Sequence, residues 1–181
     1  MQASSSAKSN QAKVNDMTVF LCGFMGCGKS TAGKLAAKKL GCGFTDTDDL
    51  IVRTFDMTIP EIFAQKGEPF FRSAEAEIVK SLCGKKVVAA CGGGAMLNPD
   101  TARAAVESGS AVVFLDVPFE VCYERIKDDT NRPIVVNSTK EELKALYDQR
   151  REVYLRHSNI HITCADSPIQ TAEQIAAAIK K

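Results

Sequence analysis

The sequence lacks the features that would direct it to a membrane or to nucleic acid. No apolar run approaches the roughly 18 residues that a helix needs to cross a bilayer. The 23 Lys and Arg residues are nearly balanced by 22 Asp and Glu residues, which leaves a formal net charge of +1. Such a chain has no overall field to attract nucleic acid. We therefore expect neither partner, and any anion site must be local.

Cysteines are present, but not in patterns typical of disulfides or metal sites. The chain has seven, an odd number, with no C-x-x-C pair and no secretory signal before them. His157 and His161 lie near Cys164 in the sequence without the second cysteine that a zinc finger requires. Because free thiols fit a reducing compartment, the expected location is cytoplasmic.

The first sixteen residues differ in composition from the rest. They are rich in Ser, Ala, Lys and Gln and nearly free of large apolar side chains, which predicts a disordered tail over 1–16. The lack of acidic residues before Asp16 leaves a transit peptide open, although the lack of Arg weakens that interpretation. Residues 17–181 have the length of a single domain with one core.

The most informative motif lies at residues 23–31, which read G-F-M-G-C-G-K-S-T and match the phosphate-binding loop G-x-x-x-x-G-K-[ST]. Glycines let successive backbone N–H groups turn toward one phosphate. Lys29 is expected to reach the β- and γ-phosphates, and Ser30 to place its hydroxyl on Mg²⁺. The predicted nucleotide-binding residues of this loop are Gly26, Cys27, Gly28, Lys29, Ser30 and Thr31.

Beyond this loop, short apolar runs alternate with segments of helical periodicity. Strands are predicted at 18–22, 43–45, 86–90, 111–116 and 159–164. Helices are predicted at 32–40, from 58, and at 69–82, 98–109, 119–126, 139–156 and from 167. The alternation predicts an α/β fold of three layers, with helices on both faces of a parallel five-stranded sheet. The polar stretch at about 127–138 predicts a mobile surface loop.

In such a sheet the ligand lies beyond the carboxyl ends of the strands. Asp46 and Asp48 follow the second predicted strand, where they can help to hold Mg²⁺ and accept a proton, or simply cap a helix. Three glycines, 92–94, follow the third strand and suit either close approach of a ligand or a flexible turn. Arg72 stands beside two aromatic residues and is either a functional cation or an ordinary exposed helix residue.

Taken together and in order, these segments resemble the shikimate kinase family, across residues 18–168. After the phosphate-binding loop come F-x-D-[ST]-D at 44–48, G-E-x-x-F-R-x-x-E at 67–75, G-G-G at 92–94, R-P at 132–133 and R-x-x-x-Y at 150–154. Each motif after the first is weak alone, and their ordered occurrence is what carries the resemblance. It implies a P-loop kinase fold and ATP-dependent phosphorylation of the 3-hydroxyl of shikimate, on the way to chorismate and the aromatic amino acids.

The resemblance also implies roles for the residues that bind the acceptor and the metal. Asp48 would bind the substrate hydroxyls and act as the base. Arg72 and Arg150 would hold the shikimate carboxylate, which suits the paired bonds that a guanidinium group makes. The ring would lie against Gly92, Gly93 and Gly94. Ser30 would ligate Mg²⁺ directly, and Asp46 would support it through water.

The remaining implied roles concern ATP. Arg132, on a lid at about 127–138, would close over the phosphates and, with Lys29, neutralise the charge that develops during transfer. Arg125 would pack on the adenine, and Pro168 would lie near it. Lid closure would exclude water from the reaction. A small molecule and ATP are the expected ligands, and a monomer is the expected state.

Cys91 departs from the family's pattern, because Thr or Ser usually precedes the three glycines. Two alternatives stay open on the sequence. One is another small-molecule kinase of this architecture, acting on gluconate or a nucleoside monophosphate. The other is a non-catalytic nucleotide-binding module, which would be expected to lose the base, the metal ligand or the lid arginine. Asp48, Ser30 and Arg132 are all present, which argues against such a module.

Overall fold

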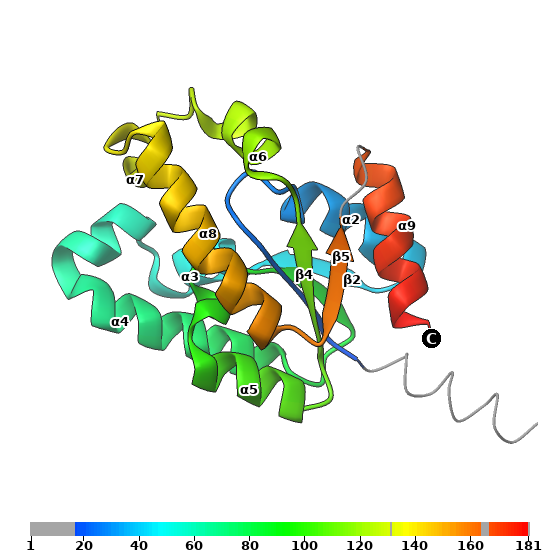
Figure 1. Cartoon of the computed structure of the whole chain (residues 1–181). Coiled ribbons are helices and arrows are strands. Elements are labelled where there is room, and N and C mark those ends of the chain that lie inside the picture. The colour runs from blue at the N-terminus through cyan, green and yellow to red at the C-terminus, as the bar shows by residue number, and fades with distance from the viewer. Residues whose placement is uncertain (1–16, 131, 164–166, 181) are drawn as a thin grey trace, which may run out of the picture.

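Five parallel strands form one sheet at the centre of the fold (Figure 1). The computed structural model describes residues 17–130, 132–163 and 167–180. The strands are β1 (Val19–Cys22), β2 (Gly43–Asp46), β3 (Val87–Ala90), β4 (Ala111–Asp116) and β5 (Ile160–Thr163), in the spatial order β2-β3-β1-β4-β5. The predicted α/β fold and its parallel sheet are confirmed. The predicted tail at 1–16, and Cys164, lie outside the described residues.

The central strands are apolar except for Asp116 at the end of β4, because both faces of the sheet are covered. All residues of β1 and β4 are buried. β1 lies between its two neighbours, since Val19 pairs with Val88 of β3 on one side and with Ala111 of β4 on the other. Every strand runs in the same direction, so all the carboxyl ends meet at one edge, which is where the chemistry was predicted.

Helices occupy most of the rest of the chain. They are α2 (Lys29–Leu40), α3 (Thr47–Phe55), α4 (Ile59–Leu82), α5 (Pro99–Glu107), α6 (Phe119–Ile126), α7 (Pro133–Val136), α8 (Lys140–His157) and α9 (Pro168–Ile179), with a 3-10 turn at Ala95–Leu97. Capping boxes at Thr58 and Thr139 begin α4 and α8, each with its Glu three residues later.

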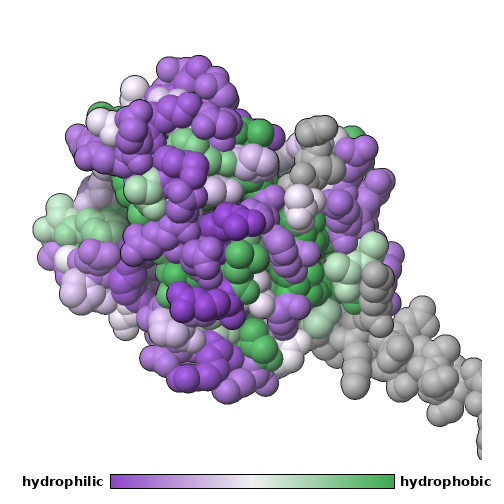
Figure 2. Space-filling view, in the orientation of Figure 1, coloured by the Kyte–Doolittle hydropathy of each residue, from purple (hydrophilic) through white to green (hydrophobic). Residues whose placement is uncertain are grey.

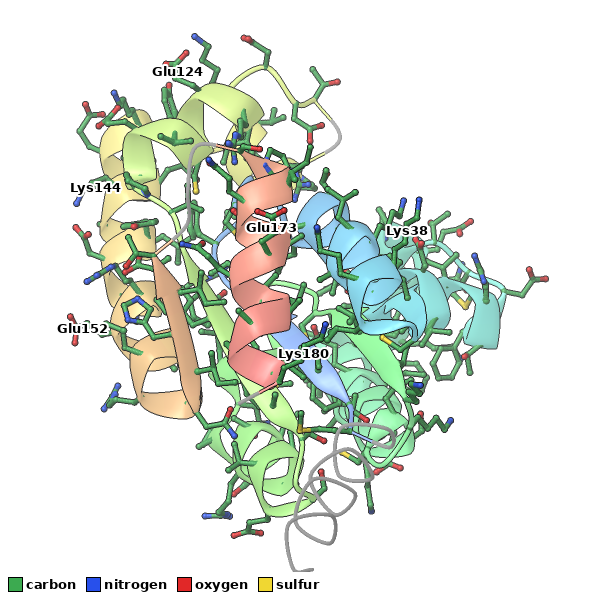
Figure 3. All side chains as sticks on the ribbon, turned by 90° about the vertical axis from the view of Figure 1, so that its right-hand side faces the viewer. Lys38, Glu124, Lys144, Glu152, Glu173 and Lys180 are labelled. Carbon is green, nitrogen blue, oxygen red and sulfur yellow. The ribbon has the colours of Figure 1, made fainter. Side chains whose placement is uncertain are left out.

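The helices form two layers around the sheet. α2 and α9 pack together on one face, where Ala36 and Ile175 are buried against strand residues such as Leu21 (Figure 3). α4, α5 and α8 cover the other face, where Tyr154 of α8 joins a core that includes Phe20. The alternation of side chains along each strand sends them to the two cores in turn. Hydrophilic side chains cover most of the outer surface on the side of α8 (Figure 2).

Three local features differ from the sequence-based expectation. α3 was not predicted; it begins because Asp46 caps it, its side chain accepting from the backbone N–H of Asp48, and because Ile51 is buried against α4. The two helices expected around residue 67 form one element interrupted at Gly67, which has φ 81°. The loop predicted at 127–138 contains the short helix α7, where Pro133 suits a first turn and Val135 is buried.

Among the described residues, no helix combines the length and the apolar character needed to cross a membrane.

One buried hydroxyl joins the start of β1 to the end of α4. The Oγ1 of Thr18 lies 2.6 Å from the carbonyl oxygen of Leu82 and 2.8 Å from that of Lys85, and it accepts from the N–H of Lys85 at 3.1 Å. Thr18 is fully buried, so water does not replace these bonds when the hydroxyl is removed. The turn between α4 and β3 therefore depends on this side chain.

We predict that Thr18→Val lowers the free energy of unfolding by about 1–2 kcal/mol, because it keeps the shape and removes buried hydrogen bonds that water does not replace. Urea denaturation measures the loss. Thr54→Val is the matched control, because the Thr54 hydroxyl bonds only Leu50 on an exposed helix face, where water takes its place. Equal, small losses in the two variants would contradict this account of the turn.

Candidate active site

A cleft of about 770 Å³ opens at the carboxyl edge of the sheet. It is lined by the loops that follow β1, β2, β3 and β4 and by residues of α4, α7, α8 and α9. Every residue predicted above to bind nucleotide, metal or acceptor lines this one cleft, from the phosphate-binding loop to Arg72, Arg125, Arg132, Arg150 and Pro168. Segments far apart in the sequence are therefore brought together, while their individual roles remain predictions.

The backbone of the phosphate-binding loop requires its glycines. Gly26 and Gly28 have φ of 79° and 90°, in a region of the Ramachandran plot that residues other than glycine adopt only at an energetic cost. A Cβ at Gly26 would also lie 2.7 Å from the carbonyl oxygen of Cys122. α2 begins at Lys29, directly after this turn, so its unpaired N–H groups and the positive end of its dipole face the cleft. The loop is thus built as an anion site.

The side chains of this loop are held by its own carbonyl groups. The Nζ of Lys29 donates to the carbonyl oxygens of Gly23 (2.8 Å) and Phe24 (3.2 Å). The Nη1 of Arg125, from α6, donates to the carbonyl oxygen of Gly26 at 3.0 Å. Two cations are therefore bonded to the backbone of the loop, and their positive charge favours a polyphosphate ligand.

Ser30 and Asp46 meet at the mouth of the loop and have the chemistry of a magnesium site. The Ser30 hydroxyl donates to Oδ2 of Asp46 at 3.0 Å, while Oδ1 of Asp46 accepts from the N–H of Asp48 at 3.0 Å. The carboxylate of Asp46 is thus compatible with both roles predicted from the sequence. One oxygen caps α3, and the other lies beside the Ser30 hydroxyl, where it could support Mg²⁺. Hydroxyl and carboxylate oxygens are the ligands that Mg²⁺ accepts, usually with water and phosphate completing its shell.

Ser30 and Asp46 alone do not supply a complete set of protein ligands for a metal ion. Among the described residues, no group of three or more His, Cys, Asp or Glu side chains is arranged to hold an ion. A sparse set of oxygens fits Mg²⁺ bound mainly through phosphates and water.

The carboxyl group of Asp48 is strongly perturbed by its position in the cleft. Its Oδ1 atom is buried and has no hydrogen-bond partner within the described residues. Burial, and then the negative charge of Asp46, raise the pKa of Asp48 to about 6, and the positive charge of Lys29 opposes the shift. A carboxylate with this pKa is ionised at neutral pH and still basic enough to accept a proton from a hydroxyl, as a general base requires.

The three glycines after β3 are needed for space rather than for backbone conformation. None of them has a positive φ. A Cβ at Gly92 would collide with Oδ1 of Asp48, and one at Gly94 would collide with Nη1 of Arg72. The side chains that face the glycines are therefore those predicted to bind the acceptor. The groups that approach this backbone closely are the protein's own side chains, and close approach of a ligand stays a prediction.

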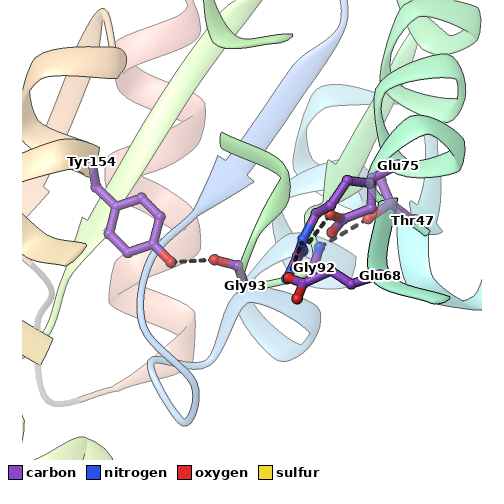
Figure 4. Close-up of polar contacts among 7 residues, drawn as sticks. Thr47, Glu68, Glu75, Gly92, Gly93 and Tyr154 are labelled. Atoms are coloured by element: carbon purple, nitrogen blue, oxygen red, sulfur yellow. Dashed lines mark hydrogen bonds and ion pairs between the residues drawn. The ribbon is translucent and has the colours of Figure 1, made fainter. Parts of the chain in front are cut away.

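Arg72 is held in place by two acids on its own helix. Its Nη1 donates to Oε2 of Glu75 at 2.6 Å, and its Nε and Nη2 donate to Oε1 of Glu68 at 3.2 and 3.1 Å (Figure 4). Glu75 is buried, and burial raises its pKa while the ion pair with Arg72 opposes the rise. Arg150 lines the same cleft and has no ion-pair partner among the described residues, so its charge is available to an anion.

Several residues of the site were not assigned a role from the sequence. Glu75 and Tyr154 stand in quoted motifs but served there only as landmarks. Thr47 lies between the two predicted aspartates, and its Oγ1 accepts from the N–H of Gly92 at 2.9 Å. Tyr154 donates its hydroxyl to the carbonyl oxygen of Gly93 at 2.6 Å (Figure 4). Spacing cannot reveal such partners, because the bonds join loops far apart in the sequence.

The two remaining expectations concern Cys91 and Arg132. Cys91 is buried at the end of β3, and its N–H donates to the carbonyl oxygen of Leu21 at 3.0 Å, so the thiol takes the place of the family's usual hydroxyl without disturbing the strand. Arg132 lines the cleft beside α7, and its Nε donates to Oδ2 of Asp129 at 2.8 Å. The lid arginine is thus in the cleft, and its closure over phosphates stays a prediction.

Comparison with known proteins agrees with this chemistry. The shikimate kinase family model matches residues 25–180. A shikimate kinase from Geobacillus thermodenitrificans is 40% identical over 180 residues, covering 96% of this chain and 94% of the relative. One from Bacillus licheniformis is 38% identical over 172 residues, covering 93% of this chain and 97% of the relative.

Solved structures give the same result. The shikimate kinase from Acinetobacter baumannii in complex with shikimate has a TM-score of 0.83 and 30% identity, covering 94% of this chain and 96% of that chain. A gluconokinase from Sinorhizobium meliloti has a TM-score of 0.56 and only 18% identity over 91% of this chain and 92% of its own, which shows a shared fold alone. The chain belongs to the shikimate kinase family and is an ATP-dependent kinase.

Proposed function

We propose that this cleft transfers the γ-phosphoryl group of ATP to the 3-hydroxyl of shikimate, giving shikimate 3-phosphate and ADP. The observation that carries the proposal is the set of charges around the glycines at 92–94. Asp48 offers a desolvated carboxylate, while Arg72 and Arg150 offer guanidinium groups. A small acceptor that carries both hydroxyls and a carboxylate fits this set. The complex named for the Acinetobacter baumannii relative supports shikimate as that acceptor.

At the acceptor end of the cleft, the arginines would orient the substrate and the aspartate would accept its proton. Arg72 and Arg150 would each grip the carboxylate of shikimate through paired bonds, which fixes the ring against Gly92–Gly94. Asp48 would then accept the proton of the attacking hydroxyl as the new phosphate ester forms. The raised pKa of Asp48, about 6, matches it to that task near neutral pH.

At the nucleotide end, the protein supplies positive charge in fixed positions. The backbone from Gly26 to Thr31 would cradle the phosphates, with Lys29 on the β- and γ-phosphates and Arg132 closing over them from the lid. Arg125 and Pro168 would border the adenine. Mg²⁺, held at Ser30 and supported by Asp46, would neutralise part of the phosphate charge when it is bound.

We also propose that residues 17–181 act as one domain, in the cytoplasm and as a monomer. The six cysteines among the described residues are free thiols, which is consistent with a reducing compartment.

The acceptor is tested by ADP release from MgATP with shikimate, with gluconate, with nucleoside monophosphates and with no acceptor. We expect turnover with shikimate alone, because gluconate lacks the ring that would lie against Gly92–Gly94 and nucleoside monophosphates lack the carboxylate that Arg72 and Arg150 would hold. Turnover with gluconate or a nucleoside monophosphate, and none with shikimate, would contradict the proposed acceptor site. ATP binding without turnover of any acceptor would favour the non-catalytic module.

Asp48→Asn is predicted to have opposite effects on catalysis and on stability. Without the base, turnover should fall by about 10²-fold or more, while ATP binding is retained. A raised folded-state pKa means that the native protein binds more protons than the unfolded chain between about pH 4 and 6, so stability is lost as pH rises through that window. The neutral amide removes this loss, and the variant should be more stable at pH 7 by about 3 kcal/mol.

Asp49→Asn is the matched control, because Asp49 is an exposed carboxylate in the same helical turn. It should keep near wild-type turnover and show little gain in stability. Steady-state ADP release and urea denaturation at pH 5 and pH 7 measure the two effects. Near wild-type turnover in Asp48→Asn would sink the assignment of the base, and a loss of stability at pH 7 would show that the carboxylate is not strained by burial.

A further inference from the structure

Helix α8 carries two buried tyrosines, seven residues apart and therefore on one face. The hydroxyl of Tyr147 donates to the carbonyl oxygen of Val117, in the loop after β4, at 2.8 Å. The hydroxyl of Tyr154 donates to the carbonyl oxygen of Gly93, in the loop after β3, at 2.6 Å. Each tyrosine thus holds the backbone of a loop that lines the cleft.

The carbonyl groups of the three glycines are all bonded, but in different ways. That of Gly92 accepts from the N–H of Ala95 at 3.2 Å, and that of Gly94 accepts from the N–H of Leu97 at 3.0 Å. These two bonds are local turns of the 3-10 segment. The carbonyl of Gly93 relies on Tyr154, a residue 61 positions further along the chain. The middle peptide of the loop is therefore oriented by a side chain from another layer of the fold.

The orientation of that peptide decides what faces the acceptor. All peptide bonds among the described residues are trans, and in a trans peptide the C=O and the following N–H point in opposite directions. Because the carbonyl of Gly93 points at Tyr154, the N–H of Gly94 points away from it. Within the described part of the chain, the N–H groups of Gly93 and Gly94 have no acceptor, and both glycines line the cleft. They are donors available to an oxygen of the ligand.

Glycines cannot hold such an orientation by themselves. A peptide between two glycines rotates with little steric resistance, since both residues tolerate either sign of φ. In the opposite orientation the carbonyl oxygen of Gly93 would face the cleft, and it would repel an anionic acceptor and the carboxylate of Asp48. The hydroxyl of Tyr154 opposes this rotation. Burial raises the pKa of Tyr154, so the phenol stays protonated and remains a donor.

We propose that Tyr154 is a positioning residue for the acceptor, which acts by fixing the Gly93–Gly94 peptide so that its N–H donates to an oxygen of the bound substrate. The identity of that substrate as shikimate rests on the proposed function above. The positioning role requires only an oxygen-bearing anion in the cleft. Arg150, one turn before Tyr154 on α8, would contact the same anion, so the helix supplies both a direct contact and the support for a backbone contact.

The test is Tyr154→Phe, which removes the hydroxyl and keeps the ring that packs on Phe114 at a centroid distance of 5.4 Å. We expect KM for shikimate to rise about 5- to 10-fold, the effect of one lost buried hydrogen bond. KM for ATP should stay within about twofold, since the nucleotide loop makes no use of this bond. A general loss of structure would instead change KM for both shikimate and ATP, or would lower kcat without changing either KM.

Tyr147→Phe is the matched control, because it deletes the same kind of bond from the same helix. It should lose a similar amount of thermal stability and leave KM for shikimate unchanged. If both variants raise KM for shikimate equally, the effect belongs to α8 as a whole and the specific role of Tyr154 is overturned. The role is also overturned if Tyr154→Phe leaves KM for shikimate at the wild-type value.

A second measurement does not depend on the acceptor. In the ligand-free protein, the amide resonance of Gly94 should be a single sharp NMR signal, and in Tyr154→Phe it should broaden or split as the peptide rotates. Unchanged Gly94 signals in Tyr154→Phe would overturn the positioning role. If wild-type protein does not turn over shikimate but the Gly94 signal still changes in the variant, the proposed acceptor fails while the positioning role of Tyr154 stands.

Discussion

The site depends on burying one oxygen of a carboxylate without a hydrogen-bond partner among the described residues. Asp48 is buried at Oδ1 without a hydrogen-bond partner, an arrangement that costs folding free energy and persists only in a well-supported frame. The support comes from the ends of β1, β2 and β3, which bring the carboxylate between the ammonium group of Lys29 and the glycine loop. Gly92 must be glycine because Asp48 occupies the space of its side chain. Burial thus raises the basicity that the proposed reaction would use, and it lowers the stability of the folded protein.

The position of the site could be predicted from the sequence because its chemistry is carried by local motifs. The phosphate-binding loop, the aspartates after β2 and the glycines after β3 all stand at strand ends, and parallel strands bring those ends to one edge. The long-range contacts could not be predicted. α3 was missed because its apolar face is decided by packing against α4, and the partners of Thr47 and Tyr154 are set by tertiary distances that spacing does not encode.

The fold itself does not select the acceptor. A gluconokinase shares the architecture at 18% identity, so the difference in substrate must come from side chains at the strand ends. In this chain Arg72 and Arg150 come from α4 and α8, on the sheet face opposite the α2–α9 layer. The nucleotide loop leads into α2 of that other layer. Under the proposed function, the acceptor would be held by residues of α4 and α8 and the phosphates by the start of α2. The two would meet near Asp48, in the first turn of α3 after β2.

The most direct test of this account is a measurement of the pKa of Asp48 in the ligand-free protein. The carboxyl ¹³C NMR signal of Asp48 reports its ionisation across a pH titration, and Asp48→Asn identifies that signal. The account predicts a midpoint near the raised pKa of about 6. A midpoint at the ordinary value of about 4 would show a solvated carboxylate. That result would contradict the claim that burial makes Asp48 the base of the reaction.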